Sequence, residues 1–333
     1  MNKQGRYAVL LSCLSLLVFL LFVASLAVGP AGIGFRASMR GLFSNDAGAV
    51  ALIMHEIRLP RALLGLMIGA TLGLSGAVLQ GYLRNPLAEP GLLGVSASAS
   101  LGAVIAIYTG LSALFSLALP LLALVFAFLS VIAVRALAGG AARSLSMILA
   151  GVAVTSFAGA MTSLALNLSP NPFAAMEIMF WMLGSLTDRS MVQFWLAAPF
   201  MVVGWCLLFA SARALNAMTL GEDAAASLGI SRKRTERLVV WGVAVSVGAA
   251  TAVSGAIGFI GLVVPHVLRP LVGHVPSRLL PASALGGAAV LLTADIAVRV
   301  IAPERDLKLG VLTAIVGAPF FLWLIYKTRR EML

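Results

Sequence analysis

Long unbroken apolar runs constrain this chain more than any other feature of its sequence. The first covers residues 7–28, close to the roughly 20 residues that a helix needs to cross the hydrocarbon core of a bilayer. Backbone inside lipid has to satisfy its own hydrogen bonds, which leaves only helices or a closed barrel. Barrel strands alternate apolar and polar residues, and these runs do not. The sequence therefore predicts an all-α polytopic membrane protein.

The composition agrees with this prediction. Hydrophobic residues make up 61% and charged residues 11% of the 333 residues, and the mean hydropathy is +1.04. A soluble domain has about a quarter charged residues, so this chain lacks the polar residues to cover a soluble surface. The connections between the apolar runs are short. We therefore expect one compact transmembrane domain over residues 1–333.

We expect about ten transmembrane helices, an even number that puts both termini on one side. With both termini cytoplasmic, most of the 23 lysines and arginines fall in inner loops, as the positive-inside rule predicts. The same rule accounts for the net charge of +11 without a nucleic-acid partner. The eighth span is short and contains Pro265. The expected spans are residues 7–28, 61–82, 91–109, 113–135, 143–167, 190–213, 236–257, 258–274, 278–299 and 309–327.

The cysteines and histidines do not indicate a metal or redox site. Cys13 and Cys206 stand singly inside apolar runs, where a cysteine behaves as a small hydrophobic residue. His55, His266 and His274 lie in different segments and lack the converging spacing of metal ligands. We therefore predict no metal and no cofactor.

The longest inner loop, residues 214–236, has a helical signal of its own. Glu222 and Asp223 would lie in a first turn, where acids interact favourably with the helix dipole. Gly229 stands where a helix should stop. The pattern alone leaves two interpretations open. The segment is either a helix anchored at the membrane interface or a peg for a soluble partner.

Glycines four residues apart mark the second predicted span. Gly65, Gly69 and Gly73 fall on one helix face, and glycine allows a neighbouring backbone to approach closely. Close packing matters in lipid because burial of apolar surface does not by itself hold helices together there. We predict that these glycines pack helices and do not contact a substrate.

On the outer side, residues 168–190 form a connection longer than a tight turn. The apolar stretch at residues 173–186 predicts a short helix lying along the membrane interface. Trp181 within it suits interfacial anchoring, although burial between helices would suit it equally.

The predicted spans lack the charges that would power transport. Proton- or sodium-driven transporters usually carry ionisable groups within the membrane. Here Glu177, Asp188, Asp295 and Arg299 fall at or near span ends, and no Walker A sequence is present. The pattern indicates the membrane half of a machine powered by another subunit. The alternative is a self-powered secondary transporter or channel, which would need intramembrane ionisable groups or a broken-helix site.

Several motifs in order resemble the FecCD family of permeases in type II ABC importers, which take up iron-siderophores, haem and vitamin B12. The resemblance extends from about residue 56 to the C-terminus. The motifs are RLPR at 58–61, GAVLQG at 76–81, RNPLAEPGLLG at 84–94, GAIGFIGLVVPH at 255–266 and GVLTAIVGAPFF at 310–321.

The resemblance implies a homodimer of ten-helix subunits in a bacterial inner membrane. Two cytoplasmic ABC ATPases and a periplasmic binding protein would complete the assembly, so ATP hydrolysis is expected on a partner and not on this chain. The inner loop would contain the coupling helix that sits in a groove of the ATPase. Its expected contact residues are Gly221, Glu222, Asp223, Leu228 and Gly229.

The resemblance also implies that outer arginines dock acidic residues on the binding protein. Arg58, Arg61 and Arg299 match those positions. Electrostatic pairing of this kind chiefly sets the rate and orientation of docking. The alternative is that these side chains extend to lipid headgroups.

The sequence does not identify the cargo. Family frequency favours an iron-siderophore, and haem and cobalamin stay open because a separate binding protein makes much of the choice. The chain departs from the family pattern at one position. Lys308 stands where the family commonly has a proline, and proline in a first helical turn presets the entry of the chain into a helix.

Overall fold

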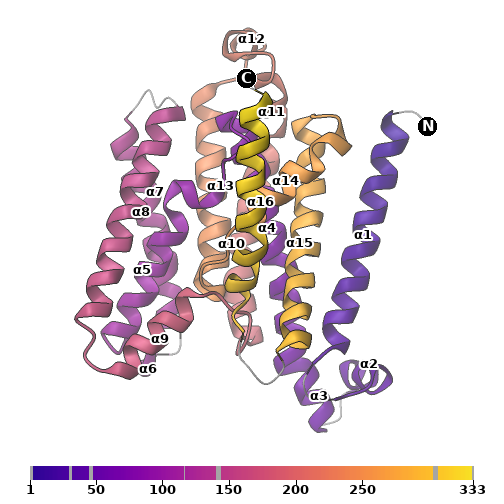
Figure 1. The fold of residues 1–333 in the computed structure, drawn as a ribbon, viewed down its shortest axis with the longest axis vertical. Coiled ribbons are helices and arrows are strands. Elements are labelled where there is room, and N and C mark those ends of the chain that lie inside the picture. Colours follow the sequence, from indigo (N-terminus) through magenta and orange to yellow (C-terminus); the bar gives the residue numbers. More distant parts are fainter. Residues whose placement is uncertain are drawn as a thin grey trace.

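The computed structural model describes residues 3–29, 32–44, 48–115, 117–139, 144–302 and 307–331. Every regular element within these ranges is a helix, so the prediction of an all-helical fold is confirmed. The long helices run roughly along one axis and form a single elongated bundle (Figure 1).

The elements follow one another along the chain with short connections. They are α1 (Lys3–Ala27), α2 (Phe35–Phe43), α3 (Ala49–Ile53), the π-helix η1 (Met54–Arg58), α4 (Leu59–Leu83), the 3-10 helix η2 (Pro90–Leu93), α5 (Val95–Tyr108), α6 (Leu111–Leu114), α7 (Ala118–Ala138), α8 (Ser144–Asn167), α9 (Pro172–Met182), α10 (Met191–Ala210), α11 (Ala212–Met218), α12 (Glu222–Ser227), α13 (Arg232–Ser254), α14 (Ile260–Leu268), the 3-10 helix η3 (Pro270–Val272), α15 (Pro276–Ile301) and α16 (Leu309–Glu331).

Seven helical stretches in the described part of the chain are long and apolar enough to cross a membrane, and each overlaps a predicted span. They are Gln4–Ala27, Ala49–Leu83, Ala118–Ala138, Leu145–Asn167, Met191–Met218, Arg232–Ser254 and Pro276–Ile301.

The third and eighth predicted spans correspond to shorter helices. The helix α5 has 14 residues and α14 has nine, whereas α16, at the tenth predicted span, has 23 residues. The predicted extent of the eighth span, residues 258–274, was wrong. Phe259 has a left-handed φ of 68°, and the chain enters α14 only at Ile260.

The two ends of the bundle are different. The first residues of α1 and the last residues of α16 lie at the same end as α12, whereas α2, α3, α6 and α9 lie at the opposite end (Figure 1). We call these the α12 end and the α9 end.

The centre of the bundle is the antiparallel pair α4 and α15, which pack backbone against backbone. A Cβ atom added to Gly69 would lie 2.4 Å from the carbonyl oxygen of Gly287, and one added to Gly73 would lie 2.0 Å from that of Ser283. Gly65 instead faces side chains, the nearest being Leu292. Two of the three glycines expected to pack helices therefore lie where no larger residue fits.

The helix α9 begins where the sequence places the start of the interfacial helix and is oblique to the bundle axis (Figure 1). Asn171 caps it by accepting a hydrogen bond from the backbone N–H of Ala174 at 2.8 Å. Phe173 and Phe180 are exposed, whereas Trp181 is buried. Trp181 therefore packs within the protein and is not an interfacial anchor in this subunit.

Candidate functional sites at the two ends of the bundle

A short helix, α12, projects from the α12 end. Gly221 begins it with a φ of 115°, and Gly229 follows it with a φ of 78°. A side chain would be strained at either position even though both lie in open space. Leu228 is 61% exposed, while Ala225 is buried and attaches the helix to the bundle.

Three polar contacts attach α11, the helix that precedes α12, to the central pair α4 and α15. The guanidinium of Arg84, at the end of α4, donates to the backbone carbonyl of Met218. The Asn216 side chain donates to Ser277 Oγ at 2.9 Å and accepts from the Ser277 backbone N–H, also at 2.9 Å. Ser277 lies in the first turn of α15. The helix α11 is therefore bonded to both α4 and α15.

The two acids of α12 have different surroundings. Glu222 forms an ion pair with Arg232 at 2.7 Å, and both side chains are exposed. Such a surface pair is worth about 0–1 kcal/mol. No ion pair to Asp223 occurs among the described residues. The carboxylate that is open to a partner is therefore that of Asp223.

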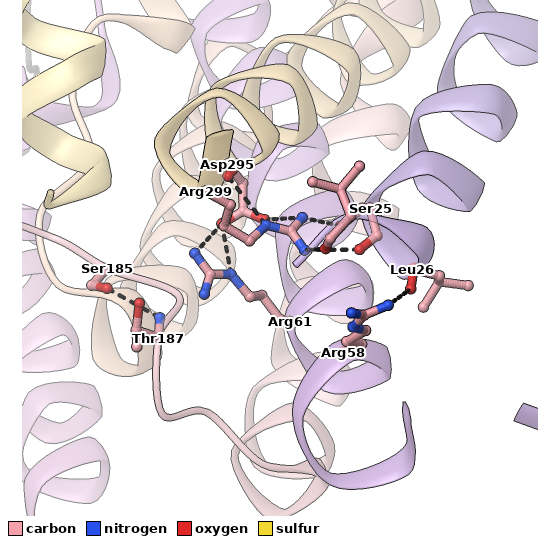
Figure 2. Close-up of polar contacts among 9 residues, drawn as sticks. Ser25, Leu26, Arg58, Arg61, Ser185, Thr187, Asp295 and Arg299 are labelled. Carbon is pink, nitrogen blue, oxygen red and sulfur yellow. Dashed lines mark hydrogen bonds and ion pairs between the residues drawn. The ribbon is translucent and has the colours of Figure 1, made fainter. Parts of the chain in front are cut away.

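The α9 end contains a buried cluster of charge between α4 and α15 (Figure 2). Asp295 is 1% exposed. One of its carboxylate oxygens accepts from Arg61 at 2.8 Å, and the other accepts from Arg299 at 2.7 Å. One carboxylate therefore holds two guanidinium groups from different helices.

Arginines also satisfy the carbonyl groups at the end of α1. Arg58 donates to the carbonyl oxygens of Leu26 and Ala27, both at 2.9 Å. Arg299 donates to those of Ser25 and Val28 at 2.8 and 2.6 Å. The last carbonyls of a helix have no partner within the helix, and the negative end of the helix dipole favours cations. These two side chains thus fix the end of α1 to the bundle.

This arrangement bears on the predicted docking residues. Arg58 and Arg299 are 4% and 9% exposed, and the Arg61 side chain is 14% exposed. The structure therefore brings the three arginines to one end of the bundle, where internal acceptors occupy them. Their internal bonds had not been predicted, although the spacing of four residues between Asp295 and Arg299 is typical of an ion pair within a helix.

A further acid was also not predicted to have a role. Glu89, in the connection between α4 and η2, accepts a hydrogen bond from the backbone N–H of Phe259 at the start of α14. Burial raises the pKa of Glu89 above its ordinary value, and this hydrogen bond partly opposes the shift. No sequence pattern indicated it, because its partner is a backbone group 170 positions further along the chain.

Within the described residues, no group of three His, Cys, Asp or Glu side chains is arranged to hold a metal ion. His266 packs edge-on against Phe320, with 5.9 Å between ring centroids. His55 and His274 are exposed.

Known proteins resemble the chain over nearly its whole length. The FecCD transport family matches residues 16–327. The hemin transport system permease protein HmuU of Yersinia pestis is 36% identical, covering 99% of both chains. The vitamin B12 import system permease protein BtuC of Salmonella typhi is 39% identical, covering 99% of this chain and 98% of the relative. A solved inward-facing structure of a metal-chelate type ABC transporter superposes with a TM-score of 0.83 at 32% identity, covering 95% of this chain and 98% of that one.

These similarities agree with the motifs and the fold described above. Because the family match covers almost the entire helical bundle, the resemblance that the sequence indicated is confirmed. The chain belongs to the FecCD transport family and is a multi-pass ABC importer permease, a transport subunit and not an enzyme.

Proposed function

We propose that this permease carries an iron chelate from a periplasmic binding protein to the cytoplasm. The observation that carries the proposal is the pairing of a helical bundle with the small projecting helix α12. The helix before it, α11, is bonded to α4 and α15. Its relatives import hemin and vitamin B12 by name, and its structural neighbour is a metal-chelate type transporter. An iron-siderophore is our first choice of cargo, with haem and cobalamin as the competitors.

The proposed working unit contains two copies of this chain in a bacterial inner membrane, with ten membrane-crossing segments in each copy and all termini cytoplasmic. Two ABC ATPases would bind at the α12 end and one binding protein at the α9 end. The termini and α12 share one end of the bundle (Figure 1), which is compatible with this orientation.

We propose that α12 is the coupling helix. Leu228 supplies an exposed apolar contact and Asp223 an exposed carboxylate, while Gly221 and Gly229 allow the sharp turns on either side. Glu222 contributes through its ion pair with Arg232, which holds α12 against the start of α13. A rigid helix of this kind transmits the closure of a nucleotide-bound partner to the spans beside it.

We further propose that Arg61 is the principal docking residue of the α9 end. It is the most exposed of the three arginines, and it shares Asp295 with Arg299. An acid on the binding protein would take the place of Asp295 as the partner of Arg61, while Arg299 keeps the Asp295 charge compensated. Arg58 and Arg299 would act indirectly by holding the end of α1.

The test is reconstitution of the chain with its ATPase and binding protein in liposomes. Uptake and ATP hydrolysis are compared for a ferric siderophore, haem and cobalamin. We expect ATP-dependent uptake of the siderophore and stimulation of hydrolysis by the loaded binding protein. Uptake of haem or cobalamin alone would overturn the choice of cargo. Uptake without ATP would favour the self-powered alternative and sink the proposal as a whole.

A further inference from the structure

A cleft of about 390 Å³ opens at the α9 end between α9, the loop at residues 185–189 and the residue that precedes α16. Its walls combine aromatic rings with charged groups. The residues that determine its chemistry are Glu177, Phe180, Trp181, Asp188, Arg189 and Lys308. None of the contacts described above for the docking arginines or the coupling helix uses these side chains.

Arg189 is the most unusual of these residues. Its Nε is buried and has no hydrogen-bond partner in the described part of the chain. Burial lowers the pKa of Arg189, and the neighbouring Asp188 opposes the shift. Burying a guanidinium nitrogen without an acceptor is costly, so an anionic group that reaches it from the cleft would stabilise this side chain.

Trp181 adds a second unsatisfied donor beside the same cleft. It is 8% exposed, and its indole Nε1 is buried without a hydrogen-bond partner among the described residues. Buried indole N–H groups usually have an acceptor. Two buried donors with no acceptor favour a ligand that brings oxygen atoms.

Lys308 supplies a second cation at the position where this chain departs from its family. Its ammonium group lies 5.3 Å from the centre of the Phe180 ring, a distance at which a cation and an aromatic face attract each other. A proline at this position would supply neither the charge nor the contact. The departure from the family pattern therefore changes the cleft.

The two acids of the cleft do not cancel its preference for an anionic ligand. Glu177 and Asp188 are exposed, and solvent and salt screen exposed charges strongly. Arg189 is only partly exposed and its Nε is buried, so its interaction with a ligand is screened less. The exposed Phe180 ring meanwhile offers a face on which a planar group can stack.

We propose that this cleft is a cargo subsite that binds an ionised oxygen carried on an aromatic group, with Arg189 and Lys308 recognising the charge and Phe180 the ring. This inference rests on the proposed function, because that function is what would bring cargo to the α9 end. It narrows the cargo to chelates that present an aromatic carboxylate or phenolate.

The test measures binding to the full chain in nanodiscs, without ATPase or binding protein. The probes are benzoate, cyclohexanecarboxylate and benzamide, which separate an aromatic anion from a non-aromatic anion and a neutral aromatic. Titration calorimetry gives the affinities, and empty nanodiscs correct for partition into lipid. We expect benzoate to bind most tightly of the three.

Variants assign the binding to the cleft. Arg189→Gln is expected to weaken benzoate binding by about tenfold or more, the size of one lost charge-assisted contact. Arg189→Lys should retain part of it. Lys308→Pro, which restores the family residue, should weaken binding several-fold. Arg40→Gln, which removes an exposed arginine of α2 at the same end, is the matched control and should bind benzoate normally.

Two results would overturn the proposal. One is equal affinity for benzoate and benzamide, and the other is unchanged benzoate binding in both Arg189→Gln and Lys308→Pro. A thermal unfolding midpoint like that of the wild type shows that a variant has folded. This test is independent of the test of the proposed function. A chain that binds benzoate in the cleft but supports no uptake would contradict the transport proposal and not the proposed binding in the cleft.

Discussion

The two ends of the bundle use charged residues in opposite ways. At the α12 end, Glu222, Asp223 and Arg232 are exposed, and the ion pair among them is solvated. At the α9 end, Asp295 and Arg299 are buried and bonded to each other and to α1. Both sets flank predicted spans and look alike in the sequence. The comparison shows that charge at a span end is exposed at one end of the bundle and held in internal bonds at the other.

The largest expected effect comes from removing the shared carboxylate of the α9 end. In Asp295→Ala, Arg61 and Arg299 lose their common acceptor while Arg299 stays buried. Breaking a buried ion pair in this way costs roughly 3–5 kcal/mol. We expect a clear fall in the thermal unfolding midpoint of the purified protein.

Asp223→Ala on α12 is the matched control and should leave the midpoint almost unchanged. Equal midpoints for the two variants would contradict the contrast between the ends.

The next largest effect is expected on transport activity, in a variant whose stability should not change. Leu228→Glu places a charge on the exposed side of α12, where the ATPase is proposed to bind. We expect uptake to fall by about tenfold or more, equivalent to roughly 1.4 kcal/mol of lost coupling, while the unfolding midpoint stays constant.

Leu114→Glu, at an 84% exposed leucine of the α9 end, is the control for adding a charge on an exposed leucine. If Leu228→Glu transported normally and still bound the ATPase, α12 would not be the coupling helix.

A smaller effect is expected for the exposed ion pair of the α12 end. Glu222→Ala removes the partner of Arg232, and exposed pairs of this kind contribute about 0.2–1 kcal/mol. The unfolding midpoint should change by less than about a third of the Asp295→Ala effect in 0.1 M salt. High salt should reduce the difference further because it screens exposed charges. A fall in the unfolding midpoint as large as that of Asp295→Ala would contradict the distinction between exposed and buried ion pairs.

The smallest effect concerns Glu89, in the connection between α4 and η2. Its raised pKa means that the folded protein binds the proton more readily than the unfolded chain does. The associated stability is therefore present at low pH and is lost as the pH rises through the folded pKa. Glu89→Gln keeps an acceptor for the Phe259 N–H and removes the titration.

The stability of the wild type relative to Glu89→Gln should accordingly fall as the pH rises above the ordinary value for glutamate. Parallel stability curves for the two proteins across this range would show that Glu89 does not titrate differently on folding.

The sequence predicted the long helices well because hydropathy reports directly on lipid exposure. The residues 7–28, 143–167 and 278–299 correspond closely to α1, α8 and α15. It predicted α14 poorly. The apolar stretch there is uniform, whereas the break depends on Phe259 adopting a left-handed conformation and on the packing of Gly261 against Pro90. Such tertiary contacts leave no trace in local hydropathy.

The candidate sites also combine features that the sequence could predict with features that it could not. The helix stop at Gly229 and the first-turn acids of α12 could be predicted because they are local features of ten neighbouring residues. The bonds of Arg58 and Arg299 to the end of α1 could not, because each joins segments far apart in the chain. Neither could the cleft at Lys308, where the sequence showed only that a proline was missing.

The bonds from Arg84 and Asn216 have a consequence for how many parts of the subunit are free to move independently. Since Gly69 and Gly73 leave no gap between α4 and α15, those two helices have little freedom to slide or separate. The hydrogen bonds of Asn216 and Met218 attach α11, the helix that precedes α12, to both of them. Because Asp295 lies on α15, we expect a displacement of α12 to be passed through α11 to the helix that carries this carboxylate.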